Sequence, residues 1–359
     1  MTATGVGEQL ADLGCWRAIL VSLTAGEHPT GAAAAAAMAD ILEGGATSAQ
    51  IAAFCVALRM KGETVEEMAG LLAAMLAYAQ PVPLPPDLDV VDTCGTGGDR
   101  SNSINVSTIA ALVVAGAGAP VCKHGNRAAS SACGSADVLE ALGVAIDLGP
   151  SDVAACVEEV GMGFCFAPRF HAALRHAGPT RRELGVSTVF NFLGPLANPG
   201  RARRQVLGVS DTAMVDKMVG VLAASGTERA LIVYGHDGLD ELTTTTTSTV
   251  VELRDGTVSS YVVDPVDLGI TRAEPGDLRG GDAATNAAIA RRVCGGDLGP
   301  HRDIVLLNAS AGLVAAGVAD DLAAGLELAA AAVDDGRAET VLDSLVSVSQ
   351  ARAARPPQT

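Results

Sequence analysis

The sequence predicts an α/β protein built from a small helical N-terminal domain and a larger α/β domain around a mostly parallel central sheet. Three observations predict this fold. Alanine-rich stretches between capping signals fill the first eighty residues, four prolines follow within residues 81–86, and short β-branched runs then alternate with helical stretches. We therefore expect a helical domain at 1–80, joined by helices from about 169–192, and an α/β domain at 81–359.

Capping signals predict three helices in the first domain. Thr30 precedes an alanine run that stops at Gly44 and Gly45. The pairs Thr47 with Gln50 and Thr64 with Glu67 each fit the S/T-x-x-E/Q pattern, in which two side chains satisfy free amides at a helix start.

The α/β domain is expected to follow the same kind of local signals. We expect strands near residues 90–91, 119–122, 205–209, 230–234 and 261–263, and helices near residues 107, 136–142, 212–224, 283 and 319–334. Only 3% of the residues are aromatic while 49% are hydrophobic, so small aliphatic side chains must form the core.

Charge and composition exclude several classes of function. The formal net charge of −17 disfavours nucleic acid as a partner. The longest nearly apolar run, residues 109–121, is shorter than the roughly 20 residues that a membrane span needs. The eight cysteines show no CxxC pair, so we expect reduced thiols and a cytoplasmic protein.

A glycine-rich run, Asp92–Asp99, follows an expected strand and precedes an expected helix. Three glycines in four positions allow backbone amides to turn toward an anion, although an ordinary glycine-rich turn remains open. The spacing fits neither a dinucleotide fingerprint nor a P-loop. Shortly afterwards Asn105–Thr108 offers an amide and two hydroxyls, which suit a helix cap or a phosphate.

Two further segments carry charge. Lys123–Ser131 gathers two cations, a histidine, an amide and two hydroxyls, which favours an anion site over a solvated basic loop. Asp237–Glu241 offers adjacent carboxylates, which suit Mg²⁺ but which alone are typical of a solvated turn. Together the segments predict a ligand with two phosphate groups, at least one magnesium ion and a second, anionic ligand held by arginine.

Seven ordered motifs, spread over most of the chain, resemble one known family. They are GTGGD at 95–99, NVST at 105–108, KHGNRAASS at 123–131, GSADVLEALG at 134–143, GPTRRELG at 178–185, FNFLGPLANP at 190–199 and DGLDE at 237–241. They closely resemble the motifs of the anthranilate phosphoribosyltransferases.

The resemblance implies an activity and an architecture. The implied glycosyltransferase moves the 5-phosphoribosyl group of phosphoribosyl pyrophosphate (PRPP) to the amine of anthranilate, giving N-(5-phosphoribosyl)anthranilate and pyrophosphate in tryptophan biosynthesis. The implied fold is the nucleoside-phosphorylase-like arrangement of class III phosphoribosyltransferases. It also implies a homodimer through the helical domain, two Mg²⁺ ions, small-molecule substrates, and neither nucleic acid nor membrane as a partner.

Site residues are carried over from the same motifs. For PRPP the resemblance implies Gly95, Gly98, Asp99, Ser103, Asn105, Val106, Ser107, Thr108, Lys123, His124, Gly125, Asn126, Arg127, Ala128, Ala129, Ser130, Ser131 and Ser135. For anthranilate it implies Gly95, Asn126 and Arg181, with His124, Pro168 and His171 as weaker candidates. Ser107, Asp240 and Glu241 would hold the metal, and Lys123, Asn126 and Arg181 are the catalytic candidates.

The chain departs from the family pattern at three places. Ser103 stands where the family commonly has threonine, Ala132 stands where it has lysine or a similar residue, and the threonine run 243–247 replaces a Gly-Pro. The last two put loop closure and magnesium handling in question.

Two alternative functions remain open from the sequence. A pyrimidine nucleoside phosphorylase would share the implied fold but would act on a nucleoside and free phosphate. A non-catalytic relative would bind nucleic acid through a basic surface, which the net charge disfavours.

Overall fold

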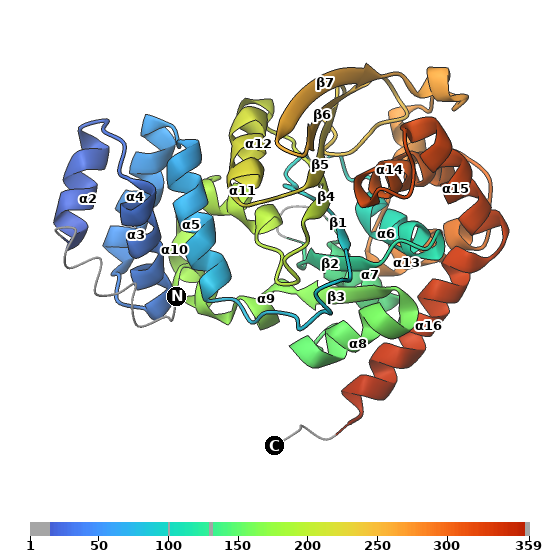
Figure 1. Cartoon of the computed structure of the whole chain (residues 1–359), viewed down its shortest axis with the longest axis horizontal. Coiled ribbons are helices and arrows are strands. Elements are labelled where there is room, and N and C mark those ends of the chain that lie inside the picture. Colours follow the sequence, from blue (N-terminus) through green and yellow to red (C-terminus); the bar gives the residue numbers. More distant parts are fainter. Residues whose placement is uncertain (1–14, 100, 129–131, 356–359) are drawn as a thin grey trace.

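The computed structural model describes residues 15–99, 101–128 and 132–355. It contains a group of helices beside a larger part that is built around a sheet (Figure 1). The helices that begin the described chain are α2 (Cys15–Thr24), α3 (Gly31–Glu43), α4 (Ser48–Lys61) and α5 (Val65–Ala77). Residues 78–90 contain no regular helix or strand and lead into the sheet.

The capping signals were predicted correctly. The Thr30 side chain accepts a hydrogen bond from the Ala33 amide, and Gly44 ends α3 with a left-handed φ of 81°. Thr47 and Thr64 both form complete capping boxes, with Gln50 and Glu67 respectively. These local bonds satisfy amides that a helix start leaves free, which is why short-range patterns locate them.

Seven strands form one sheet in the order β3-β2-β1-β4-β5-β6-β7. Their bounds are β1 (Val91–Gly95), β2 (Val121–Gly125), β3 (Met162–Phe166), β4 (Arg204–Gly208), β5 (Arg229–Gly235), β6 (Ser248–Arg254) and β7 (Thr257–Val263). The first five strands pair in parallel, and β6 and β7 join them antiparallel. The mostly parallel sheet predicted from the sequence is confirmed.

The remaining helices cover the sheet and connect its strands. They are α6 (Val106–Gly116), α7 (Ser135–Ala141), α8 (Pro150–Val160), α9 (Ala167–Phe170), α10 (Gly178–Leu184), α11 (Val189–Leu193), α12 (Val215–Ala224), α13 (Ala283–Cys294), α14 (Pro300–Ala316), α15 (Leu322–Asp334) and α16 (Arg337–Ala353). Short 3-10 turns lie at η1 (Ala172–His176), η2 (Gly194–Leu196), η3 (Thr212–Met214), η4 (Pro265–Leu268) and η5 (Pro275–Leu278).

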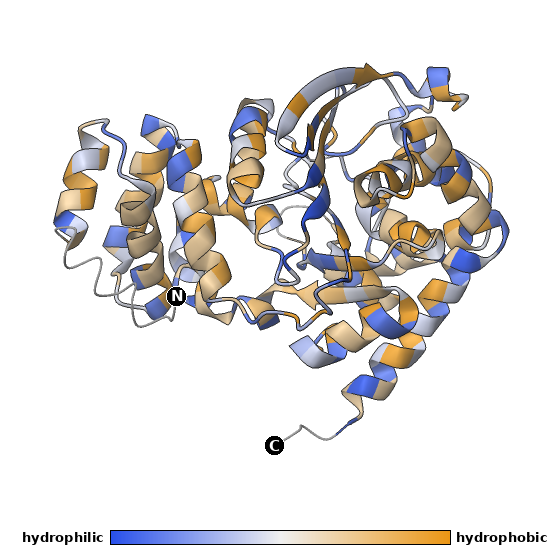
Figure 2. Cartoon of the chain, in the orientation of Figure 1, coloured by the Kyte–Doolittle hydropathy of each residue, from blue (hydrophilic) through white to orange (hydrophobic). Residues whose placement is uncertain are grey.

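The two faces of the sheet belong to two separate hydrophobic cores. Along β5, Leu231 and Val233 pack with α6 and α14, whereas Ala230 and Ile232 pack with α12 and the N-terminal helices. Helices such as α16 carry both hydrophobic and hydrophilic positions, as expected of a layer with one face in solvent (Figure 2). The sheet therefore connects the helical part to the C-terminal helices through its alternating side chains.

The chain returns to the N-terminal helices after β3. Here α10 packs against α4, and α11 packs against both α4 and α5. The chain then crosses back into the sheet at β4.

One strand differs from its expected bounds in a way that affects the site. We expected a strand at 119–122, with Lys123 and His124 in the loop after it, but β2 extends to Gly125. Lys123 and His124 pair in parallel register with Phe164 and Cys165 of β3. The end of this strand was not predicted, because polar side chains interrupt the apolar pattern that is typical of a buried strand.

All eight cysteines are free thiols, and seven of them are buried. Within residues 15–99, 101–128 and 132–355, no helix has the length and apolar character needed to cross a membrane.

Close packing of α3 on α5 generates a testable prediction. A Cβ added at Gly70 would lie 2.0 Å from the Gly31 carbonyl oxygen, which is backbone and cannot rotate away. We expect Gly70→Ala to lower the free energy of unfolding by about 1–3 kcal/mol or more, measured by urea denaturation. Gly276→Ala is the control, because a Cβ there meets nothing within 4 Å; equal stability of the two variants would contradict the prediction.

Candidate active site

The predicted segments gather where the strand order reverses. Strands β2 and β3 lie on one side of β1, and β4 and β5 lie on the other. Parallel sheets bind ligands at such a switch point, outside the carboxyl ends of the strands. The glycine-rich run follows β1 at this edge, and Ser210 follows β4.

The glycine-rich run lies directly against the acidic turn. A Cβ at Gly95 would lie 2.3 Å from the Asp240 Oδ2 atom, and a Cβ at Gly208 would lie 1.6 Å from the Asp240 carbonyl oxygen. The Gly97 amide donates a 2.7 Å hydrogen bond to Asp240 Oδ2. Gly97 and Gly98 have φ values of 65° and 85°, which other residues rarely adopt. These glycines therefore allow the close approach of an acidic side chain to the loop.

Ser107 joins the other two segments. Its amide donates to Glu241 Oε1 at 3.2 Å, and its hydroxyl accepts from Lys123 Nζ at 3.5 Å. Lys123 is 1% exposed and also donates a short hydrogen bond to the Thr93 carbonyl. Three segments that are far apart in the sequence therefore meet at the start of α6.

The acidic side chains are crowded and largely buried. Burial raises the pKa of Asp240 to about 7, and the negative charge of Asp99 adds to the increase. Burial, together with the charge of Asp240, also raises the pKa of Glu241 well above its usual value, although Lys123 acts in the opposite direction. Such a group of oxygen ligands favours a hard divalent cation, which would relieve the repulsion.

The threonine run forms hydrogen bonds with the acidic turn. Asp237 Oδ2 accepts hydrogen bonds from the hydroxyls of Thr243, at 2.7 Å, and Thr245, at 2.5 Å. Gly238 has a φ of 95°, which allows the turn that brings Asp240 to the site. The threonine run, which departs from the family pattern, thus holds Asp237 by hydrogen bonds. Asp240 and Glu241 instead face the glycine-rich run and Ser107.

The basic loop after β2 is only partly described. Asn126 accepts hydrogen bonds at its carbonyl from the Ser135 hydroxyl and the Ala136 amide. The Arg127 guanidinium pairs with Asp137 at 2.9 Å and with Glu140 at 2.8 Å. It therefore faces α7 in this structure. Ala128 completes the described part of the loop, and Ala129, Ser130 and Ser131 lie outside the described residues.

The other residues carried over for PRPP also lie around the start of α6. Ser103 accepts a hydrogen bond from the Ser101 hydroxyl and forms an isolated bridge with Arg279. Val106 and Thr108, in the first turn of α6, are buried. Gly125 ends β2, where a Cβ would lie 2.1 Å from Ser135 Oγ.

Sequence reasoning missed two residues that hold this site together. Asn286 donates to Asn105 Oδ1 at 2.8 Å, while Asn105 donates to the Cys133 carbonyl at 3.0 Å. Ser210 donates to the Gly97 carbonyl at 2.7 Å. Asp282 caps α13, which carries Asn286, but that cap signals only a helix start; their contacts arise from distant segments.

Arg181 lies on α10, apart from the acidic turn. Its guanidinium stacks on the ring of Phe190 at 4.9 Å from the ring centroid. Burial lowers its pKa, although arginine stays charged at neutral pH. In the part of the chain that the structure describes, it has no ion pair with a carboxylate. A half-buried arginine of this kind is suited to bind a carboxylate ligand.

The three weaker candidates for anthranilate differ in their surroundings. Pro168 is exposed in α9, whereas His124 and His171 are each 7% exposed. His124 donates toward the Gly194 carbonyl, and His171 toward the Ala197 carbonyl. Burial lowers the pKa of His171 to about 4, so its imidazole is neutral at pH 7.

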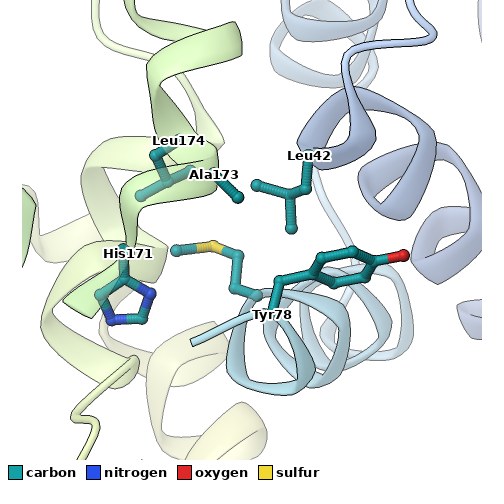
Figure 3. A pocket seen from close by; sticks show the side chains of 6 residues that line it. Leu42, Tyr78, His171, Ala173 and Leu174 are labelled. Atoms are coloured by element: carbon teal, nitrogen blue, oxygen red, sulfur yellow. The ribbon is translucent and has the colours of Figure 1, made fainter. Parts of the chain in front are cut away.

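His171 also borders a small pocket between η1 and the N-terminal helices (Figure 3). The side chains that line it are Leu42, Met75, Tyr78, His171, Ala173 and Leu174. With a neutral histidine, this lining offers no cation for a carboxylate ligand, whereas Arg181 does.

Comparisons with known proteins cover nearly the whole chain. Residues 17–79 match the glycosyl transferase family helical bundle domain, and residues 87–339 match the glycosyl transferase family a/b domain. The chain is 54% identical over 347 residues to an anthranilate phosphoribosyltransferase of Rhodococcus jostii (strain RHA1), covering 95% of each protein.

Solved structures show the same likeness. An anthranilate phosphoribosyltransferase from Thermus thermophilus superimposes with a TM-score of 0.88 at 40% identity, covering 92% of this chain and 99% of that one. The enzyme from Saccharomyces cerevisiae in complex with PRPP and Mg gives a TM-score of 0.80 at 28% identity, covering 89% and 92% of the two chains.

The buried acidic turn predicts a pH-dependent stability. Because the native pKa of Asp240 is raised to about 7 from 3.8, the folded state retains a proton that the unfolded state loses near pH 4. The free energy of unfolding therefore falls as pH rises from about 4 to about 7. In EDTA at pH 8, we expect Asp240→Asn to be more stable than the unmodified protein by at least about 1 kcal/mol.

This difference should become smaller at pH 5, where the carboxyl group of Asp240 is mostly protonated. Thermal unfolding at both pH values measures it. Asp267→Asn, at an exposed position, is the control and should match the unmodified protein at both. If Asp240→Asn is less stable than the unmodified protein at pH 8, the ionised carboxylate does not destabilise the folded state, which would contradict the prediction.

Proposed function

This chain belongs to the anthranilate phosphoribosyltransferase family, and from that premise we propose that it transfers the 5-phosphoribosyl group of PRPP to the amine of anthranilate. The observation that carries the proposal is the meeting of three segments at Ser107. The Ser107 hydroxyl accepts a hydrogen bond from Lys123, and the Ser107 amide donates one to Glu241. One small, metal-chelated diphosphate would contact a glycine loop, a lysine and an acidic pair at such a point.

PRPP would bind along the glycine-rich run and the start of α6. Backbone amides of glycines with positive φ and the free amides at a helix N-terminus both favour phosphate oxygens. The hydroxyls of Ser107 and Thr108 and the ammonium of Lys123 add donors at the same edge of the sheet. Asn105 acts by position, since its amide is bonded to Cys133 and Asn286.

Ser107, Asp240 and Glu241 fit Mg²⁺. Their oxygen atoms are hard ligands, and the raised pKa values of the two acids support a cation beside them. The likeness to the yeast enzyme in complex with PRPP and Mg supports this assignment. We propose two Mg²⁺ ions, because the acidic pair and a bound diphosphate offer more oxygen ligands than one ion uses. Bound magnesium would neutralise charge on the departing pyrophosphate.

Anthranilate would place its carboxylate on Arg181, with Asn126 guiding it toward the ribose. The planar guanidinium matches a carboxylate, and its stacking on Phe190 fixes its orientation. The aromatic amine is neutral near pH 7 and has a free lone pair, so a strong base is unnecessary. As the bond from C1 to pyrophosphate breaks, the nitrogen bonds to C1 and then loses a proton to solvent or to pyrophosphate.

The chain's own groups would contribute mainly position and charge. Lys123 holds a positive charge beside Ser107, where negative charge grows on the leaving pyrophosphate. Arg181 holds the acceptor so that its amine faces C1. Both groups are on regular elements, β2 and α10, which limits their movement.

We also propose that two copies of the chain associate through the helical domain, taken as residues 1–80 with the helices of 169–192. Supporting this, that part exposes large hydrophobic side chains, with Val21 59% and Met60 83% exposed.

The transferase activity is tested by following the loss of anthranilate fluorescence on mixing the protein with PRPP and MgCl₂. We expect rapid loss with Mg²⁺ and arrest by EDTA, because the diphosphate is held through the metal. The variant with Asp240→Asn and Glu241→Gln should abolish turnover at ordinary magnesium while remaining folded. If the fluorescence is unchanged and a nucleoside is cleaved in phosphate buffer, the protein is a nucleoside phosphorylase.

A second test separates the two substrates. Because Arg181 carries the only charge assigned to the anthranilate carboxylate, we expect Arg181→Ala to raise the KM for anthranilate by about 10- to 100-fold. The KM for PRPP should change by less than about threefold. Arg182→Ala, an exposed neighbour on the same helix, is the matched control. Similar losses for both substrates would rule out this assignment.

A further inference from the structure

Residues 194–198, here called the linker, are the first part of the segment that connects α11 to β4. Buried side chains hold this linker. His124 Nε2 lies 3.0 Å from the Gly194 carbonyl oxygen. Gln205 Nε2 donates to the Pro195 carbonyl oxygen at 2.8 Å. Both side chains are buried, at 7% and 4% exposed, so these bonds are shielded from water.

The rest of the linker is bonded in the same way. His171 donates to the Ala197 carbonyl oxygen at 2.8 Å, and Asn198 donates to the Cys122 carbonyl oxygen of β2 at 2.8 Å. Four buried side chains therefore hold a segment of five residues by hydrogen bonds.

His124 lies between two polar groups. Its Nδ1 atom lies 2.5 Å from Asp92 Oδ2, and its Nε2 atom faces the Gly194 carbonyl. Burial raises the pKa of Asp92, but its interactions with His124 and Lys123 outweigh that effect, so the pKa lies below its usual value. The His124 ring therefore connects Asp92 of β1 to the linker.

A metal site is the alternative for this cluster, since ligand atoms of Asp92, Cys94 and His124 lie within 4.8 Å of one another. Each of these groups is already engaged. Gln205 donates to Asp92 at 3.3 Å and to the Cys94 sulfur at 3.2 Å, and burial raises the pKa of Cys94 well above its usual value. A protonated thiol is a poor metal ligand, and both ring nitrogens of His124 already face other groups, Asp92 and the Gly194 carbonyl.

Contacts and chain neighbours connect the network to both proposed substrate sites. On one side, Lys123 is adjacent to His124 and donates to Thr93, which is adjacent to Asp92. On the other side, the linker follows α11, whose Phe190 stacks on Arg181.

We propose that Asp92, His124 and Gln205 are positioning residues, which hold the linker and so set the place of Arg181 relative to Lys123. They act through the linker, whereas Arg181 and Lys123 act on the substrates. The proposal deepens the proposed function and rests on it, because Arg181 is taken as the receptor of the anthranilate carboxylate.

Gln205→Met tests the proposal, because it removes, at similar volume, the amide that donates to Pro195, Asp92 and Cys94, while the contact between Asp92 and His124 is kept. We expect the KM for anthranilate to rise at least about tenfold and the KM for PRPP to change less than about twofold. Ser349→Ala is the matched control. It removes the buried Ser349 hydroxyl on α16, which accepts a hydrogen bond from the Ala145 amide. This variant should be less stable, but its KM values for anthranilate and PRPP should not change by different factors. Equal rises in both KM values would overturn the proposal.

A double-mutant cycle with Arg181→Ala sharpens the test. If Gln205 acts through Arg181, the double variant should use anthranilate no worse than Arg181→Ala alone. Additive losses would mean that Gln205 acts elsewhere and would overturn the proposal.

Hydrogen exchange separates this proposal from the transferase activity, because it needs no substrate. We expect backbone amides of residues 178–193 to exchange at least about tenfold faster in Gln205→Met, with those of α14 unchanged. Asp92→Asn keeps the side-chain volume, should give the same result, and serves if Gln205→Met does not fold. Unchanged exchange would overturn the positioning role even in an active transferase, and an inactive unmodified protein with faster exchange in the variant would overturn only the proposed function.

Discussion

The buried ammonium group of Lys123 is the interaction on which the rest of the site depends. A charge that is 1% exposed is tolerated only where polar groups surround it, and Lys123 has the Thr93 carbonyl, the Ser107 hydroxyl and the nearby carboxyl group of Glu241. These partners come from β1, α6 and the turn after β5. One side chain thereby links three elements.

More acidic side chains than Lys123 can neutralise lie around it, and this excess favours a cation as a ligand of the site. Asp99, Asp240 and Glu241 share one region, and the pKa values of the last two are raised. With a net charge of −17, the whole protein also repels a polyanion at long range. In the proposed function, a diphosphate would therefore be attracted by local groups, namely backbone amides, Lys123 and a metal ion held by the acids.

Local patterns predicted much of this structure, and contacts between distant segments limited the rest. Thr47 and Thr64 were found because each bonds within its own helix turn. The glycine, lysine and acidic segments were recognised by composition, and parallel topology brings their ends to one edge. Asn286 and Ser210 gave no such signal, because their partners lie 181 and 113 residues away. The extent of β2 was missed because two of its buried side chains, Lys123 and His124, are polar.

The histidines show why residue type alone does not assign a role. A histidine near a binding loop suggests contact with substrate, and the resemblance implied that role for His124 and His171. In the fold, both rings face carbonyl oxygens of one linker, and only hydrogen-bond geometry reveals this. The His124 ring connects Asp92 of β1 to the Gly194 carbonyl of the linker, and both side chains are buried. In the proposed arrangement these buried groups set position, whereas Lys123 and Arg181 would contact the substrates.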